Sequence, residues 1–227
     1  MDVSDLCFFN PFAETEVTAN RLPHWQQHGA VNFLTFRLAD AIPKHLLDQW
    51  SAERDAWLVY HSTPWSVEVE AEYHRRFSGA MERWLDAGHG SCALRDPGCR
   101  AVVEDALRHF DGERCAHIAW VIMPNHVHVL FVPMEKQGRA VLYRPSLKTS
   151  WKLEEIVPCW KRHSAVRINK LLGRSGTFWQ KDYFDRLVRD QDHFANCVRY
   201  IRRNPVKAKL RKGEYTLYES DMVKSIP

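Results

Sequence analysis

The stretch "CAHIAWVIMPNHVHVLFVP", residues 115–133, decides the fold of this chain. It contains two apolar runs, 115–123 and 126–133, which are rich in β-branched and aromatic residues and are joined by Pro124 and Asn125. Two such runs on either side of a short turn predict an antiparallel β-hairpin.

The second run of this hairpin places two histidines two residues apart. Side chains at i and i+2 of a strand point to the same face, so we expect His126 and His128 to lie together while Val127 and Val129 pack on the other face. Two neutral imidazoles at this separation can bind one metal ion. Taken alone, an HxH pattern on a strand is more often exposed polar alternation.

Outward from the hairpin, the pattern predicts further elements on both sides. A strand is expected at 30–39, after a lead-in (1–29) with little periodicity, and a fourth strand at 177–189. Helical spacing and punctuation predict helices at 43–60, 66–88, 96–112, 153–173 (most convincing after Pro158) and 190–204. The predicted fold class is α+β: a ferredoxin-like antiparallel sheet with helices on one face, and a helical insert (about 43–112) after the first strand.

Composition limits the classes of protein that the chain can belong to. It has 227 residues, of which 45% are hydrophobic and 26% charged, as in soluble globular proteins. No apolar run approaches the ~20 residues that span a membrane, and the N-terminus has no pattern of a secretory signal. The six cysteines are scattered without a CxxC motif, which predicts reduced thiols in a cytosolic protein.

The net charge of +4 conceals a strong asymmetry along the chain. Residues 139–212 contain 19 Lys and Arg against 6 Asp and Glu, and the rest of the chain is acidic. Charge runs are usually solvated helix faces. A surplus of this size in one third of the chain fits a surface that meets a polyanion, most commonly nucleic acid.

A second pattern of chemical interest is "VRYIRRNPV", residues 198–206. Positions i and i+4 of a helix lie on one face, so Tyr200 and Asn204 are expected to be neighbours. Because Pro205 disfavours helical geometry before it, Asn204 is expected to be the last helical residue. A core tyrosine and a C-terminal cap remain an alternative reading of the same residues.

Together these motifs resemble the HUH endonucleases, in which two histidines flank a hydrophobic residue, and more closely the REP-associated tyrosine transposases. The resemblance runs from about Arg21 to Leu217 and is carried by "FLTFRLAD", "WVIMPNHVHVLF", "WKRHSAVRINKLLGRSGTFWQKDYFDRLVRD" and "RYIRRNPVKAKL". One departure is "WKRHSAVRINK", where relatives usually carry Ser/Thr-rich residues before the alanine. The resemblance implies an HUH domain at 30–217, with 1–29 as lead-in and 218–227 as a C-terminal tail.

The resemblance also implies a mechanism. Tyr200 would be the nucleophile, giving a 5′-phosphotyrosine and a free 3′-hydroxyl, and His126, His128 and Asn204 would hold one Mg²⁺ or Mn²⁺ ion. A phenol with a pKa of ~10 needs help near neutrality. The ion and nearby arginines are expected to supply it.

The partner implied is single-stranded or hairpin DNA, with no membrane and no small-molecule substrate, in the cytoplasm at the nucleoid. Basic residues of the last third are the expected DNA contacts: Lys148, Lys152, Lys161, Arg162, Arg167, Lys170, Arg174, Arg186, Arg189, Arg199, Arg202, Arg203 and Lys207. Aromatic residues there could stack on unpaired bases, although core packing is the more common role: Trp151, Trp160, Phe178 and Trp179. Some relatives are dimers that share their tyrosine helices and others are monomers, so a homodimer is left open.

Two other functions share many of these features. A replication-initiator or relaxase-type nickase would use the same tyrosine and histidines, but the chain shows no helicase region. A hairpin-binding protein without turnover would keep the fold, and the intact set of Tyr200, His126, His128 and Asn204 argues against it.

Overall fold

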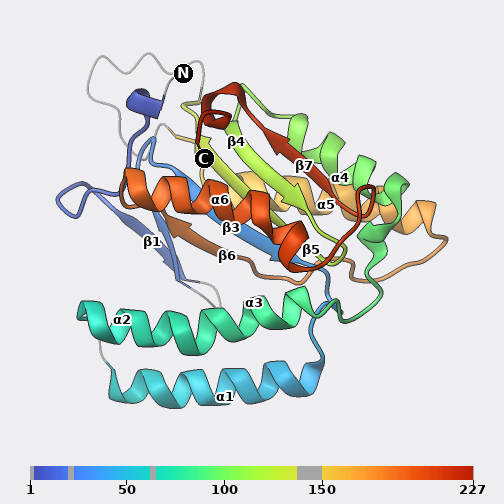
Figure 1. The fold of residues 1–227 in the computed structure, drawn as a ribbon, viewed down its shortest axis with the longest axis horizontal. Coiled ribbons are helices and arrows are strands. Elements are labelled where there is room, and N and C mark those ends of the chain that lie inside the picture. The colour runs from blue at the N-terminus through green and yellow to red at the C-terminus, as the bar shows by residue number, and fades with distance from the viewer. Residues whose placement is uncertain (1–2, 20–22, 62–64, 137–149, 227) are drawn as a thin grey trace.

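A five-stranded antiparallel sheet forms the centre of the computed structural model, which describes residues 3–19, 23–61, 65–136 and 150–226 (Figure 1). Its strand order is β6-β3-β5-β4-β7, and the first four of these follow the order of a ferredoxin-like sheet. The strands are β3 (Asn32–Arg37), β4 (Cys115–Ile122), β5 (His126–Pro133), β6 (Phe184–Leu187) and β7 (Thr216–Glu219). The predicted α+β class with an antiparallel sheet is confirmed.

The predicted hairpin is β4 and β5. Ile122 lies opposite Val127, and the turn is closed by the Met123 amide, which donates to the His126 carbonyl at 2.8 Å. On its other edge β5 pairs with β3, which puts Thr35 opposite His128. The two histidines therefore lie on the central strand of the sheet.

One face of the sheet is covered by α4 (Pro97–Arg108) and α5 (Leu153–Leu171). Val127, Val129 and Phe131 of β5 point to this side and join a core that includes Trp120 and Trp160. We call it the α4–α5 face. It contains the two helices of the ferredoxin-like unit, as predicted.

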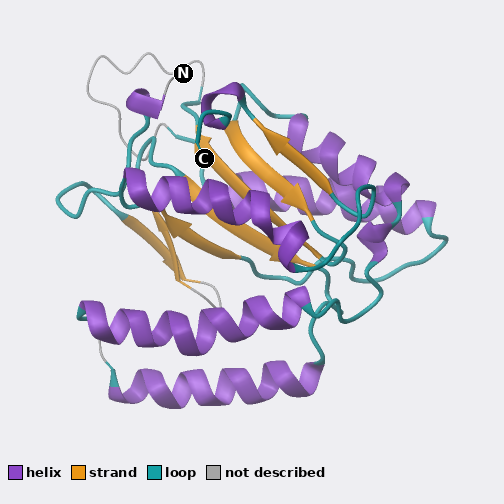
Figure 2. Ribbon diagram, viewed as in Figure 1, coloured by secondary structure: helices purple, strands orange, loops and turns teal. Residues whose placement is uncertain are grey.

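The opposite face is covered by α6 (Gln191–Lys207), so the expectation that helices lie on one face only is wrong (Figure 2). Leu130 and Val132 of β5 point to this side, where they pack with Val198 and Ile201 of α6. We call it the α6 face. The physical reason is that every residue of β5 is buried, and a strand buried on both sides needs cover on both sides.

The predicted helical insert begins with a pair of antiparallel helical segments that lie below the β6 edge of the sheet (Figure 1). The first is α1 (Lys44–Tyr60), and the second is α2 (Val67–Tyr73), a π-helical segment (His74–Ser78, η2) and α3 (Gly79–Asp86) in one run. A short 3₁₀ turn, η3 (Ala93–Arg95), leads to α4. The insert has its own aromatic packing, in which Trp50 and Trp57 of α1 meet Phe77 edge to face.

The two ends of the chain contain more structure than the sequence predicts. The lead-in has a 3₁₀ turn, η1 (Val3–Asp5), and an antiparallel hairpin of β1 (Glu16–Ala19) and β2 (Pro23–Gln26), where an irregular segment was expected. The buried ring of His24 ties this hairpin to the sheet edge, because it hydrogen-bonds to both Asp182 and Asp185. The tail is not free either. β7 pairs with β4, and a last 3₁₀ turn, η4 (Asp221–Val223), buries Val223.

Two prolines sit inside helices that were expected to begin or end beside them. α5 starts at Leu153 and passes through Pro158, and α6 continues past Pro205 to Lys207. Asn204 was predicted to be the last helical residue, but it lies within α6, three residues before its end. A proline costs a helix one backbone hydrogen bond, here the bond to the Ile201 carbonyl, and the burial of Pro205 offsets part of that loss.

Among the described residues, no helix is long and apolar enough to cross a membrane. The six cysteines are free thiols.

Candidate active site

The α6 face brings the four predicted site residues together. β5 presents His126 and His128 with their Nε2 atoms 3.0 Å apart. From α6, the Asn204 amide nitrogen lies 3.2 Å from His128 Nε2, and the Tyr200 hydroxyl lies 3.5 Å from the same atom. Residues more than 70 positions apart in sequence thus converge on one point.

The Nδ1 atom of each imidazole is hydrogen-bonded to a second residue. The Asn125 Oδ1 atom accepts from His126 Nδ1 at 2.8 Å, while the Asn125 amide nitrogen donates to the Leu85 carbonyl at 3.2 Å. Because that oxygen can only accept, the proton of His126 sits on Nδ1 and its Nε2 keeps a lone pair. The Thr35 hydroxyl, 2.7 Å from His128 Nδ1, can hold the second ring in the same way.

Burial keeps both imidazoles uncharged. It lowers the pKa of His126 to about 3, with help from the Lys207 charge. It also lowers the pKa of His128 well below its ordinary value, to which the neighbouring His126 and Arg186 contribute. Neutral imidazoles are the form that binds metal ions, so both rings are suited to be ligands.

The donor set fits a divalent cation. Ligands about 2.1 Å from an octahedral ion lie about 3 Å apart, which matches the separation of the two Nε2 atoms. Asn204 is 1% exposed, and its Oδ1 atom has no hydrogen-bond partner among the described residues. A half-turn of this amide would aim the oxygen at the histidines. Two imidazoles and one amide oxygen form a mixed N/O set that suits Mn²⁺ or Mg²⁺.

Tyr200 packs against aromatic rings but remains partly exposed to solvent. Its ring meets His128 edge to face at 5.0 Å and Phe33 at 5.8 Å, and the residue is half-buried. Burial raises the pKa of the phenol, and the carboxylates of Glu82 and Asp86 raise it further. The hydroxyl is therefore protonated at neutral pH and must lose its proton to become a nucleophile.

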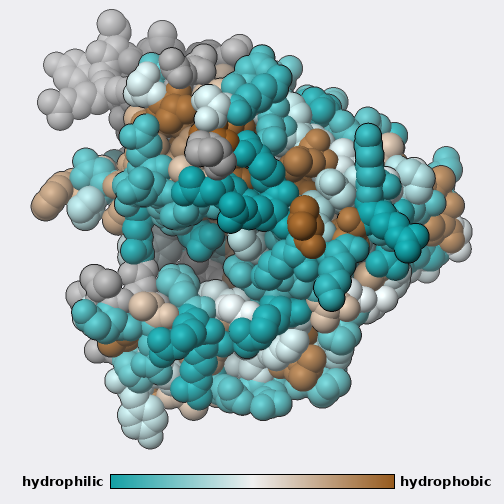
Figure 3. Space-filling view, viewed as in Figure 1, coloured by the Kyte–Doolittle hydropathy of each residue, from teal (hydrophilic) through white to brown (hydrophobic). Residues whose placement is uncertain are grey.

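A cleft opens beside this site, between the sheet and the insert. Residues of α2, the π-helical segment and α3 form one wall, and β3, β5 and β6 form the other. The wall on the sheet side includes His128 and Arg186, and the wall on the insert side includes Glu82. In Figure 3 the surface is hollowed between α6 and the insert, with hydrophilic side chains around the hollow.

The predicted DNA contacts are divided between the two faces. Those on α5 and just after it lie behind the sheet, away from Tyr200. Arg162, Lys170 and Arg174 are exposed there, and Arg167 pairs with Asp105 of α4 at 3.1 Å.

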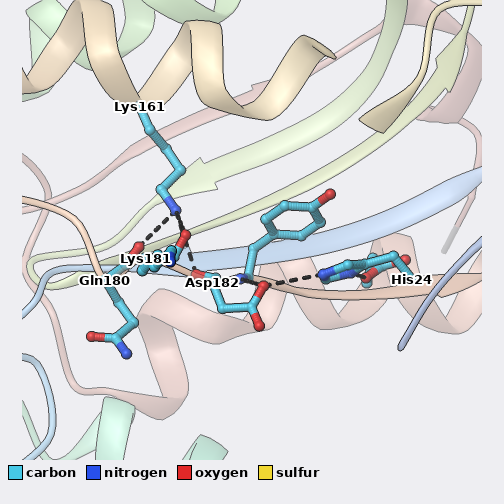
Figure 4. A network of polar contacts seen from close by, with 7 residues as sticks. His24, Lys161, Gln180, Lys181 and Asp182 are labelled. Carbon is cyan, nitrogen blue, oxygen red and sulfur yellow. Dashed lines mark hydrogen bonds and ion pairs between the residues drawn. The ribbon is translucent and has the colours of Figure 1, made fainter. Parts of the chain in front are cut away.

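Lys161, also on α5, has an internal role instead of an exposed one (Figure 4). Its amino group donates to the carbonyls of Gln180 and Lys181 at 2.6 and 2.8 Å. Burial lowers its pKa to about 8. This ammonium stabilises the segment before β6, so its predicted phosphate contact has no free group to make it.

The remaining predicted contacts among the described residues lie on β6, on or just before α6, or, for Lys152, at the start of α5. Arg186 stacks over the Phe33 ring at 4.8 Å, and Lys207 pairs with Asp86 of the insert at 2.8 Å. Arg202 bonds to Glu219 at 2.9 Å, Lys152 pairs with Glu16, and Arg199 bonds to Asn196. Arg189 and Arg203 are exposed, and the backbone amide of Arg189 donates to His193 at 3.2 Å. Lys148 lies outside the described residues. For these residues, contact with DNA stays a prediction.

The aromatic residues of this third are mainly core. Trp160, Phe178 and Trp179 are at most 4% exposed, which leaves no face for a base. Trp151 is partly exposed, but Arg114 and Lys136 lie over its ring. Core packing, the more common role, is what the structure shows for the buried three.

Three residues of the site were not found from the sequence. Asn125 was read only as a turn residue and Thr35 only as part of a strand, because their bonds to the histidines depend on pairing across the sheet. A Pro-Asn turn directly before HxH is the one local signal for Asn125. Glu82 had no signal, since it belongs to a separate helix whose docking the sequence does not reveal.

Comparison with known proteins agrees with the resemblance in the motifs. No family model matches the chain. It is 27% identical over 108 residues to a putative REP-associated tyrosine transposase of Haemophilus influenzae, which covers 48% of this chain and 57% of that protein. Among solved structures, a REP-associated tyrosine transposase bound to a REP hairpin matches with a TM-score of 0.40 and 15% identity, over 86% of this chain and 77% of that one. The resemblance to this family is thus confirmed by a curated relative, of which the chain matches little more than half.

Proposed function

We propose that this protein is a metal-dependent endonuclease and strand transferase that cuts single-stranded DNA at or near hairpins. The observation that carries the proposal is the convergence of one tyrosine hydroxyl, two neutral imidazoles and one amide on the α6 face. A phenol beside residues that can hold a cation is suited to attack a phosphodiester. The similarity to a putative REP-associated tyrosine transposase supports the same reaction.

In the proposed reaction, the Tyr200 oxygen attacks the scissile phosphorus and the bond to the 3′-oxygen breaks. The products are a 5′-phosphotyrosine and a free 3′-hydroxyl. Because the phosphotyrosine conserves the energy of the broken bond, a second 3′-hydroxyl can attack it and release Tyr200. One side chain then serves both for cutting and for joining.

His126, His128 and Asn204 would hold the divalent ion. When bound, Mg²⁺ or Mn²⁺ offsets the negative charge that grows on the phosphate oxygens. The buried Asn125 keeps His126 in the tautomer that can bind, and Thr35 does the same for His128. Arg186, which lines the cleft with His128, would attract the phosphate.

The test is covalent capture. The protein is incubated with Mn²⁺ and a pool of single-stranded hairpin oligonucleotides with random unpaired flanks, and then run on a denaturing gel. The expected result is an adduct that disappears in Tyr200→Phe. Hairpin binding with no adduct under any metal condition would instead support a DNA-binding protein without turnover.

A further inference from the structure

The cleft beside the candidate active site exposes mainly apolar surface. Its cavity measures about 190 Å³, more than ten times the roughly 10–15 Å³ that holds one water. Its lining includes His128, one of the residues that would hold the ion. Because each phosphate of a strand joins two nucleotides, DNA bound at this site brings a base close to the cavity.

Each wall of the cleft carries an aromatic ring that is only half-buried. Tyr73 ends α2 on the insert side, and Phe184 begins β6 on the sheet side. Tyr73 also packs with Trp57 and Phe77 inside the insert, which fixes the position of its ring. Phe184 meets Trp50 nearly at right angles at 6.3 Å, so these two rings do not stack face to face. Partly exposed rings on opposite walls suit a planar, unsaturated ligand.

The sheet wall adds a polar group that lacks a partner. The Asp185 side chain is 2% exposed and bonds to His24 through Oδ1, but its Oδ2 atom has no hydrogen-bond partner in the described part of the chain. A buried carboxylate oxygen in this state lowers stability, and an N–H group of a ligand can satisfy it. The edges of nucleobases carry such donors.

The insert wall contains the π-helical segment. His74 and Ser78, its first and last residues, both line the cleft and bond to each other at 3.0 Å. π-turns are rare and occur frequently at functional sites. The tyrosine chemistry proposed above does not use this wall, which is therefore available for a separate purpose.

We propose that the cleft binds one unpaired nucleobase of the DNA strand, turned out of its stack and held between Tyr73 and Phe184. The nucleotide is the neighbour of the scissile phosphate, because His128 lines the same cleft. Turning out a base is least costly in a single strand, and stacking on the two rings offsets the cost. This inference rests on the proposed function and deepens it: the insert holds a base while the sheet and α6 carry the chemistry.

The first experiment observes the base itself and needs no cutting. A hairpin is selected from the random pool by binding, and 2-aminopurine, whose fluorescence is quenched by stacking, replaces its unpaired bases one at a time. The protein carries Tyr200→Phe, so that no bond is broken. We expect protein-dependent quenching at one position beside the stem.

The ring of Tyr73 should be necessary for this signal. Tyr73→Leu keeps most of the bulk that packs in the insert but removes the ring, so the quenching should disappear and hairpin affinity should fall by about 5- to 150-fold, the range for one base–aromatic stack. Tyr73→Phe keeps the ring and should behave like the wild type. Tyr60→Leu is the matched control, because Tyr60 lies on the same insert and is 85% exposed.

A second measurement links the base to the reaction. An abasic site at the quenched position should slow adduct formation by the protein with an intact Tyr200 about as much as Tyr73→Leu slows it on the complete strand. The two changes together should cost little more than either one, because both remove the same contact. Phe184→Leu should show the same dependence from the other wall.

The outcomes separate this inference from the proposed function. An adduct without quenching at any position, or quenching that persists in both Tyr73→Leu and Phe184→Leu, would remove the base site alone. Quenching that needs Tyr73, without an adduct under any metal condition, would keep the base site and remove the proposed chemistry. A protein that neither binds a hairpin nor forms an adduct would overturn both.

Discussion

The two faces of the sheet differ in the kind of side chain that the same strand, β5, contributes to them. On the α4–α5 face, β5 contributes Val127, Val129 and Phe131 to a continuous apolar core. On the α6 face it contributes His126 and His128, which are equally buried but polar, and Asn204 adds a buried amide oxygen that has no hydrogen-bond partner in the described part of the chain. Buried polar groups that lack partners cost stability. The first face therefore stabilises the fold, whereas the second lowers stability by burying the polar groups of the candidate active site.

The largest expected effect tests the chemistry of the α6 face. Tyr200→Phe keeps the ring that packs against Phe33 and His128 but removes the attacking oxygen. We expect the covalent adduct to be lost, while the free energy of unfolding changes by no more than about 1 kcal/mol. Gel capture and urea unfolding measure the two. An adduct that persisted would point to another nucleophile, with Tyr183 of the same cleft the first to examine.

Removal of one imidazole should separate metal binding from DNA binding. His128→Ala takes away one of the few ligands, so we expect Mn²⁺ affinity to fall by at least about 10-fold and cleavage to fall with it. Hairpin affinity should change much less. Calorimetric titration with Mn²⁺ alone gives the first quantity, and His45→Ala on the exposed side of α1 is the control. Normal cleavage by His128→Ala would remove that residue from the metal site.

The α4–α5 face should respond in the reverse way. Trp160 is 1% exposed and packs against Phe131, so Trp160→Ala leaves a large cavity. We expect a loss of about 3–5 kcal/mol in the free energy of unfolding. The adduct rate per folded molecule should remain close to the wild-type rate below the unfolding transition. If the rate fell as much as in Tyr200→Phe, the division between the two faces would be wrong.

A smaller effect concerns pH and the N-terminal hairpin. Burial alone would lower the pKa of His24, but its bonds to Asp182 and Asp185 outweigh burial and raise it to about 9. A raised pKa means that the folded state binds the proton more tightly, so this contribution is complete below about pH 6.5 and is lost as the pH rises through 9. We expect of the order of 2 kcal/mol to disappear over that window in chemical unfolding, and the slope to flatten in His24→Gln but not in His45→Gln.

The smallest expected effect tests which of the two faces of the sheet DNA approaches. Arg162 on α5 and Arg203 on α6 are both exposed and lie on opposite sides of the sheet. If DNA approaches the α6 face, Arg203→Glu should reduce the slope of log affinity against log salt by about 0.7, the value for one phosphate of a single strand. Arg162→Glu should leave the slope unchanged. The reverse result would move the DNA to the α4–α5 face.

The sequence predicted the parts of this molecule that depend on local periodicity. The β4–β5 hairpin follows from two apolar runs, and the shared face of His126 and His128 follows from the period of a strand. Tyr200 and Asn204 were likewise placed on one helix face by their spacing. Such features need no knowledge of how distant segments meet.

What the sequence did not predict depends on tertiary contacts. The strands of the N-terminal hairpin have only four residues each, too few for a pattern, and are held against β6 by the bond of His24 to Asp185. The sequence does not distinguish Lys161 from Arg162, because the carbonyl groups that Lys161 bonds belong to a segment outside its own helix. Glu82 lines the cleft from a helix whose position is set by the docking of the insert.

The π-helical segment at His74–Ser78 gives the insert a property that residue chemistry does not describe. A π-turn contains more residues than an α-turn, and one residue of an α-helix corresponds to about 100° of rotation. The π-turn therefore takes up its extra residue without rotating the helix that follows. If the same residues straightened into a regular helix, α3 would turn relative to α2 by about that angle. The π-turn, more than the identity of its residues, thus sets the face that α3, with Glu82, presents to the cleft.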